Sequence, residues 1–140
     1  MTLSGHRYVI SALQFSADSK CLASGSWDSC AALWSVEEEE GKRLVGLLRG
    51  HYAGIGRVVF AANAKTLLTG GHDWMMRWWS IATSQEMLRF QDVRWWCVWN
   101  PTDNLLIWQD KQGAIRVTDL PTLAEIDVTE AKEKAEARRP

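Results

Sequence analysis

Two sets of side chains in this sequence each combine an imidazole, a hydroxyl and a carboxylate, the groups of a hydrolytic triad. His6, Ser24 and Asp28 form the first set, and a second set with the same spacing follows 45 positions later. The second set is His51, Thr69 and Asp73. Catalysis would require an exposed nucleophilic oxygen, a base and an oxyanion hole. The sequence has no nucleophile-elbow motif, and a tryptophan accompanies each set. We therefore expect structural hydrogen bonds here and no enzymatic activity.

Other patterns that bind metals or cofactors do not occur. The three histidines, His6, His51 and His72, are dispersed and lack cysteine or histidine partners at metal-ligand spacing. Gly54 and Gly56 form only a G-x-G fragment, which is too short to cradle a phosphate. We expect no metal site and no cofactor.

Composition places the chain among globular proteins. Hydrophobic residues make up 46% of the 140 residues, and nine tryptophans favour packed β-sheet. The net charge of −1 gives no reason to expect nucleic acid or a membrane as partner. The scattered cysteines Cys21, Cys30 and Cys97 form no disulfide set, and residues 1–6 lack the features of a signal peptide, so we expect a cytoplasmic location.

The positions of the elements follow from an internal repeat. Four markers recur with a shift of 45 positions, and part of a third copy follows after a shift of 39. The markers are His6 and His51, Phe15 and Phe60, Asp28 and Asp73, and Trp34 and Trp79. The loop 37–43, which the second copy lacks, accounts for the shorter shift. Within each copy, alternating apolar residues between turn residues predict four short strands, placed in the second copy at 55–60, 66–70, 75–80 and 86–90. The first copy has turns at 18–19 and 25–28 and a fourth strand at 44–48, and the third has strands at 94–99, 105–109, 114–118 and 123–128.

Four antiparallel strands every ~40–45 residues are typical of β-propeller blades. Over residues 2–128 the sequence resembles the WD-repeat propeller family, because Gly-His opens the first two copies and Trp34-Ser35 and Trp79-Ser80 replace the Trp-Asp dipeptide of the family. The resemblance implies an all-β partial propeller of three four-stranded blades at 5–48, 50–90 and 91–128, followed by a polar tail at 129–140. It also implies that the residues of each set form one hydrogen-bonded chain inside a blade, with Trp34 in the first and Trp79 in the second.

The third copy is degenerate. At its four network positions stand Phe90, Trp108, Gln112 and Thr118. Apolar packing is expected to hold this blade together instead, through Trp95, Trp99, Leu106 and Val117. Three blades cannot close a ring of ~4–8, so we expect further blades to come from a longer chain or from self-association.

The resemblance also implies a function. In this family one face of the propeller commonly docks partners, and we expect the chain to be a protein-interaction scaffold that uses Trp27 and Trp74 on that face. The alternative is a regulatory or targeting segment of a larger enzyme or signalling protein. The acidic run 37–40 is interpreted as a solvated loop and the aromatic run 95–99 as core. The full set of candidate docking residues is Arg7, Tyr8, Trp27, Tyr52, His72 and Trp74.

Overall fold

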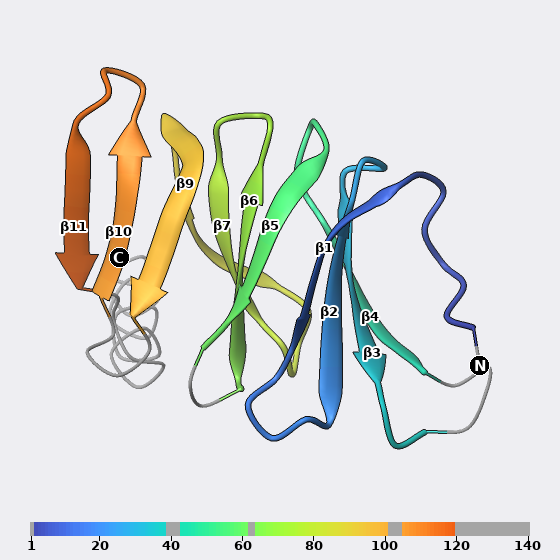
Figure 1. The fold of residues 1–140 in the computed structure, drawn as a ribbon. Coiled ribbons are helices and arrows are strands. Elements are labelled where there is room, and N and C mark those ends of the chain that lie inside the picture. The colour runs from blue at the N-terminus through green and yellow to red at the C-terminus, as the bar shows by residue number, and fades with distance from the viewer. Residues whose placement is uncertain (1, 39–42, 62–63, 101–104, 120–140) are drawn as a thin grey trace, which may run out of the picture.

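The computed structural model describes residues 2–38, 43–61, 64–100 and 105–119, with only the backbone at 94–97 and 99. These residues form eleven strands in three antiparallel sheets and contain no helix. The sheets stand side by side in chain order, with the second between the other two (Figure 1). The predicted all-β fold of consecutive propeller blades is confirmed.

Each sheet is a meander in which consecutive strands pair. The first sheet consists of β1 (Ile10–Phe15), β2 (Cys21–Ser26), β3 (Cys30–Ser35) and β4 (Leu44–Arg49). The second consists of β5 (Ile55–Phe60), β6 (Thr66–Gly71), β7 (Met76–Ser80) and β8 (Glu86–Phe90). The third consists of β9 (Val93–Asn100), β10 (Leu105–Asp110) and β11 (Ile115–Asp119).

Strands lie close to where the repeat predicts them, with two differences in the first sheet. Gly25 and Ser26, predicted to be turn residues, belong to β2, and β4 extends to Arg49. The predicted fourth strand of the third sheet at 123–128 and the tail at 129–140 lie outside the described residues. The interpretation of the side chains of Trp95, Trp96 and Trp99 as core likewise falls on side chains that the structure does not describe.

The tight turn between the second and third strand of each sheet has the same backbone geometry. Its last residue has a positive φ, at 66° in Ser29, 62° in Trp74 and 88° in Gly113. In the first two sheets an aspartate one residue earlier accepts a hydrogen bond from the backbone two residues ahead. Asp28 binds the N–H of Cys30 at 3.0 Å, and Asp73 binds that of Met75 at 3.2 Å. An aspartate at this place stabilises the turn because its short side chain can bond to the local backbone.

Apolar side chains fill the two spaces between neighbouring sheets. Between the first and second sheets the buried core contains Ala23, Ala31, Leu33, Leu48, Ile55, Val58, Phe60, Leu67 and Trp79. Between the second and third sheets it contains Ala61, Leu68, Met76, Trp78, Val93 and Leu106. Among the described residues, the second sheet is thus covered on both faces, whereas each outer sheet has a neighbouring sheet on one face only (Figure 1).

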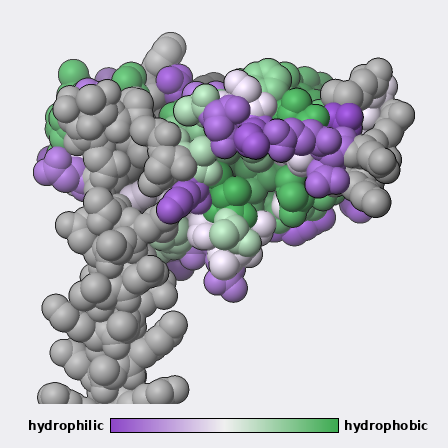
Figure 2. Space-filling view, turned by 90° about the horizontal axis from the view of Figure 1, so that it is seen from below, coloured by the Kyte–Doolittle hydropathy of each residue, from purple (hydrophilic) through white to green (hydrophobic). Residues whose placement is uncertain are grey.

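One expectation about the third sheet is wrong. Leu106 is buried as predicted, but Val117 is exposed, because it lies in β11 on the face away from the second sheet, where the described residues form no further sheet. Exposed apolar residues also occur in β1. Hydrophobic residues form a large part of the surface in the view from below, crossed by hydrophilic side chains (Figure 2).

The close approach of the first two sheets generates a prediction about Gly25. A Cβ at this position would lie 2.7 Å from Cγ2 of the buried Ile55, whereas at the repeat-equivalent Gly70 the nearest atom would be the Cβ of Arg57 at 3.6 Å. We expect Gly25→Ala to lower the free energy of unfolding by about 1–3 kcal/mol, because the sheets must move apart. Gly70→Ala should be neutral or slightly stabilising. Chemical denaturation of both variants tests this, and equal effects would contradict the packing described.

Candidate functional site

A chain of hydrogen bonds runs through the first sheet from its turn to its third strand. His6 lies in the segment before β1, and its Nδ1 is 2.9 Å from Oδ2 of Asp28 in the turn. Its Nε2 is 2.7 Å from Oγ of Ser24 in β2. The indole Nε1–H of Trp34 in β3 donates to the same hydroxyl at 2.7 Å. Four residues from separate segments are therefore joined.

The second sheet contains the equivalent chain. Nδ1 of His51 is 2.9 Å from both carboxylate oxygens of Asp73, and Nε2 is 2.8 Å from Oγ1 of Thr69. The indole Nε1–H of Trp79 donates to that hydroxyl at 2.8 Å. The eight residues implied by the family resemblance are thus brought together in two groups of four, one in each sheet.

The directions of these bonds favour a neutral imidazole. If His51 donates through Nδ1–H to Asp73, its Nε2 can accept the hydroxyl proton of Thr69, whose oxygen in turn accepts from Trp79. A protonated ring would donate from both nitrogens and leave the hydroxyl proton without this acceptor. Burial lowers the pKa of His51 below its ordinary value and outweighs the opposing hydrogen bond from Asp73. The buried chain therefore favours the neutral ring.

Both turn aspartates are held in their charged form. Burial alone would raise the pKa of Asp73, but hydrogen bonds from the backbone of Tyr52, the ring of His51 and the backbone of Met75 hold it below its ordinary value. For Asp28, burial is likewise outweighed by the backbone of Arg7, the ring of His6 and the backbone of Cys30, which lower its pKa. The carboxylates thus anchor the segments that precede β1 and β5.

This geometry does not suit a catalytic triad. The hydroxyls of Ser24 and Thr69 belong to fully buried residues and are each occupied by a ring nitrogen and an indole N–H. A nucleophile needs an oxygen that a substrate can reach. Within the described part of the chain, no group of three or more His, Cys, Asp or Glu side chains is arranged to hold a metal ion. No helix in that part is long and apolar enough to span a bilayer.

In the third sheet, different groups stand at the positions of the hydrogen-bond chain and stabilise the turn. Phe90 and Trp108, at the positions of His51 and Thr69, place their ring centroids 5.8 Å apart, so an aromatic contact replaces the hydrogen bond. The turn is held by Asp110, which is two residues before Gln112. Its carboxylate accepts from the backbone of Gln112 at 3.0 Å and of Ala114 at 2.9 Å, and from Arg116 at 2.8 Å. Because the fixed repeat spacing places Gln112 at the aspartate position, it did not reveal the role of Asp110.

Comparison with known proteins agrees with this architecture. The family described as "WD domain, G-beta repeat" matches residues 1–35 and 42–80, which is more than half of the chain. The chain belongs to the WD-repeat family. No curated protein matches it.

Solved structures show the same fold at low sequence identity. A chain of the structure titled "Crystal Structure of Mitotic Checkpoint Complex" and one titled "Structure of U3-55K" each match with a TM-score of 0.71 and 19% identity. Each match covers 84% of this chain but 38% of the solved chain. The WD repeats described here therefore span less than half of the length of these structural relatives.

Trp27 lies where the first two WD repeats meet. Its side chain is 52% exposed, and its ring is 4.6 Å from that of His72, which stands at the equivalent position of the second repeat. A Cβ on Gly54 would lie 3.0 Å from the Trp27 ring, so one side of the ring is packed against the second repeat. Trp27 is thus held in place by the neighbouring repeat and still presents half of its surface.

The other candidate docking residues surround the same turns. The backbone N–H groups of Arg7 and Tyr52 donate to the turn aspartates, and the exposed ring of Tyr52 lies 5.6 Å from the guanidinium carbon of Arg77. Tyr8 is exposed, and Trp74, in the turn of the second repeat, is 44% exposed.

Arg77 was not identified from the sequence as a residue of this region. It is buried, forms an ion pair with Glu86, and could have been noticed as a charge inside an apolar strand.

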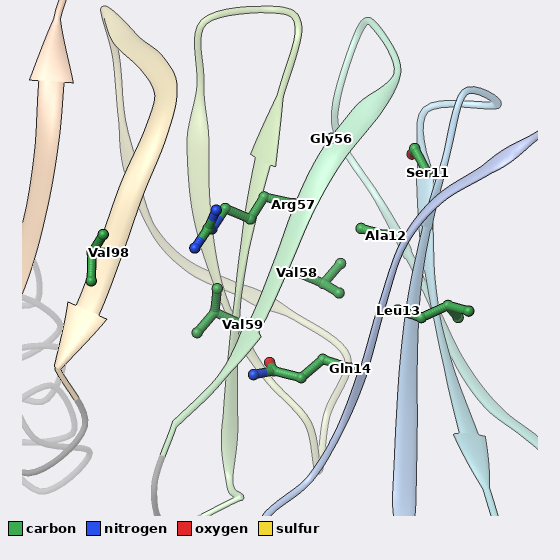
Figure 3. A pocket seen from close by; sticks show the side chains of 9 residues that line it. All are labelled: Ser11, Ala12, Leu13, Gln14, Gly56, Arg57, Val58, Val59 and Val98. Carbon is green, nitrogen blue, oxygen red and sulfur yellow. The ribbon is translucent and has the colours of Figure 1, made fainter.

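A groove of about 490 Å³ crosses the first strands of the three repeats (Figure 3). The Nε of Arg57, one of its lining residues, is buried and has no hydrogen-bond partner. The lining contains neither a histidine nor an acid, so it provides no acid–base pair. The groove is lined by Ser11, Ala12, Leu13, Gln14, Gly56, Arg57, Val58, Val59 and Val98.

The shifted turn anchor of the third repeat can be tested by paired substitutions. Asp110→Ala should lower the melting temperature by several degrees, because two backbone N–H groups and Arg116 lose their acceptor. Gln112→Ala should change it by no more than about 2 °C. Thermal unfolding followed by circular dichroism measures both, and a larger loss for Gln112→Ala would refute the assignment.

The neutral His51 predicts a pH dependence of stability. Its pKa is lowered in the fold from the ordinary 6.5, so the unfolded chain takes up a proton first as the pH falls. We therefore expect the free energy of unfolding to decrease as the pH falls below about 6.5. The lowered pKa of Asp73 should add a further loss below its ordinary 3.8. Denaturation curves between pH 8 and 5 test the histidine contribution against His51→Gln, which should show a shallower dependence. If the stability of His51→Gln depended on pH as steeply as that of the wild type, a group other than His51 would be responsible for the pH dependence.

Proposed function

We propose that this chain is a protein-interaction scaffold that docks its partner through the turn face carrying Trp27 and Trp74. The observation that carries the proposal is the placement of two half-exposed tryptophans on turns. The aspartate of each turn is hydrogen-bonded to a histidine inside the sheet, which holds the turn in place. Rigid aromatic side chains lose little entropy when a partner covers them, and tryptophan and tyrosine are enriched at interface hot spots.

The backbone of Trp74 strengthens this interpretation. Its φ of 62° is unfavourable for a bulky residue, and the equivalent positions are occupied by the small Ser29 and Gly113. Folding alone would favour a small residue or glycine at this position. A strained, half-exposed tryptophan supports a role in binding.

A second candidate is a regulatory or targeting segment within a larger enzyme or signalling protein. It is favoured by one specific observation, the 38% coverage of the solved chains that share this fold. In that setting the same turn face would bind a catalytic domain of the same polypeptide. Binding of a separate protein by the chain alone would favour the scaffold.

The double substitution Trp27→Ala/Trp74→Ala tests the docking face. If both are hot spots, each substitution should weaken partner binding by roughly 30-fold or more. Both residues are about half exposed, so the fold should persist. The measurement is the set of proteins retained by the immobilised chain, followed by titration of each against the variants.

The matched control is Val45→Ala, which changes an exposed apolar residue in β4, away from the turns. Partners retained by the wild type and the control but lost by the double variant support the proposed face. Partners retained equally by all three proteins would place the binding site elsewhere.

A further inference from the structure

The first sheet presents an apolar face whose equivalent in the second sheet is covered. Phe60 and Val58 in β5 pack against the first sheet, and Phe60 is 6% exposed. Their repeat equivalents in β1 are Phe15 and Leu13, and Phe15 is 57% exposed. Ile10 is likewise exposed, whereas its equivalent Ile55 is buried. We call the face formed by Ile10, Leu13 and Phe15 the β1 face.

The third sheet presents the opposite apolar face. In the second sheet Met76 and Trp78 of β7 pack against the third sheet, and Trp78 is 2% exposed. The equivalents in β11 are Ile115 and Val117, and Val117 is 59% exposed. We call the face formed by Ile115 and Val117 the β11 face.

These two faces are the two halves of a contact that the chain already makes twice. Within the chain, the face of one sheet that carries its third-strand residues shares a core with the first strand of the next sheet, as Ala31 and Leu33 of β3 share a core with Phe60 of β5. The β11 face is equivalent to the third-strand side of that contact, and the β1 face to the first-strand side. The sheets carrying them stand at opposite ends of the row (Figure 1), so one copy cannot bring its own faces together across the second sheet.

We propose that two copies of this chain pair head to tail, with the β1 face of each packed on the β11 face of the other. Two copies of the three sheets formed by the described residues would make a ring of six, within the ~4–8 at which propellers close. A two-fold axis would generate both contacts from one pair of faces, which closes the assembly and leaves neither face exposed. This pairing does not depend on the turn face proposed for partner docking.

The chemistry of the two faces supports a second copy as the occupant. Both are aliphatic or aromatic, and burial of such side chains drives association. The guanidinium of Arg116, between Ile115 and Val117, is paired with Asp110 of its own sheet. The net charge of −1 opposes the approach of a second copy only weakly. Side chains of different size already fill this contact within the chain, with Ala31 and Leu33 at one boundary and Met76 and Trp78 at the other.

The experiment is light scattering of the purified chain over a concentration series. The wild type should have twice the mass of one chain. Phe15→Asp and Val117→Asp should each give monomers, because each contact of the ring uses both faces, and we expect the dissociation constant to rise at least about 30-fold. Val45→Asp in β4, also on an exposed side chain, should remain a dimer.

Mixing the two monomeric variants distinguishes head-to-tail pairing from other arrangements. Phe15→Asp retains an intact β11 face and Val117→Asp an intact β1 face, so the mixture should regain dimers through one contact. Circular dichroism verifies that each variant is folded, and Leu13→Asp with Ile115→Asp forms a second pair if one is not. A wild type that stays monomeric, an open-ended assembly, or a mixture that stays monomeric would each overturn the proposal.

Discussion

A β-sheet with apolar residues on both faces must be covered on both faces, and most features of this chain follow from that constraint. The second sheet shows it met: Val58 and Phe60 are buried on one side, and Met76 and Trp78 on the other. Where the backbones of the first and second sheets come close together, only small side chains fit between them. At Gly25, on the boundary of the first two sheets, a single added carbon would meet Ile55, and the small Ala31 is buried in the same core. Met76 and Trp78 at the next boundary show that the space between sheets is set by the residues that fill it.

The buried hydrogen-bond chains fit inside this apolar packing because the ring nitrogens, hydroxyls and indole N–H groups of their residues are all paired. A buried hydroxyl or ring nitrogen without a partner costs roughly 1–3 kcal/mol, so such a chain stabilises only when it is complete. The third sheet illustrates the alternative. Where the histidine and threonine are replaced by Phe90 and Trp108, the polar chain is absent and the rings pack together. The turn still needs an acceptor for its backbone N–H groups, and Asp110 supplies it from the end of β10.

For the described residues, the sequence was sufficient to predict the strands, because the internal repeat shows which positions of the chain are equivalent. Strand positions in the second sheet were correct to within one residue, and the groups around Ser24 and Thr69 are the ones that the structure joins. Two kinds of information were out of reach. A fixed spacing identifies equivalent positions, so it cannot detect a role that moved two residues, as from Gln112 to Asp110. Alternation shows which residues share a face but not whether anything covers that face, and for this reason Val117 was wrongly expected to be core.

Comparison of the repeats also distinguishes positions that the fold requires to be of one type from positions that vary. The positions of the hydrogen-bond chain keep their type in the first two repeats, as His6 and His51 or Trp34 and Trp79 do. The turn positions do not: Trp27 is equivalent to His72 and Lys111, and Trp74 to Ser29 and Gly113. All three turns form with these different side chains, so the turn itself does not require a tryptophan. The backbone of each turn is nevertheless held by hydrogen bonds to an aspartate carboxylate. A different side chain at the exposed turn positions therefore changes the surface but leaves these hydrogen bonds in place. Such a surface can be adapted to a partner at little cost in stability, and the strained backbone of Trp74 is one of the observations on which the proposed docking face rests.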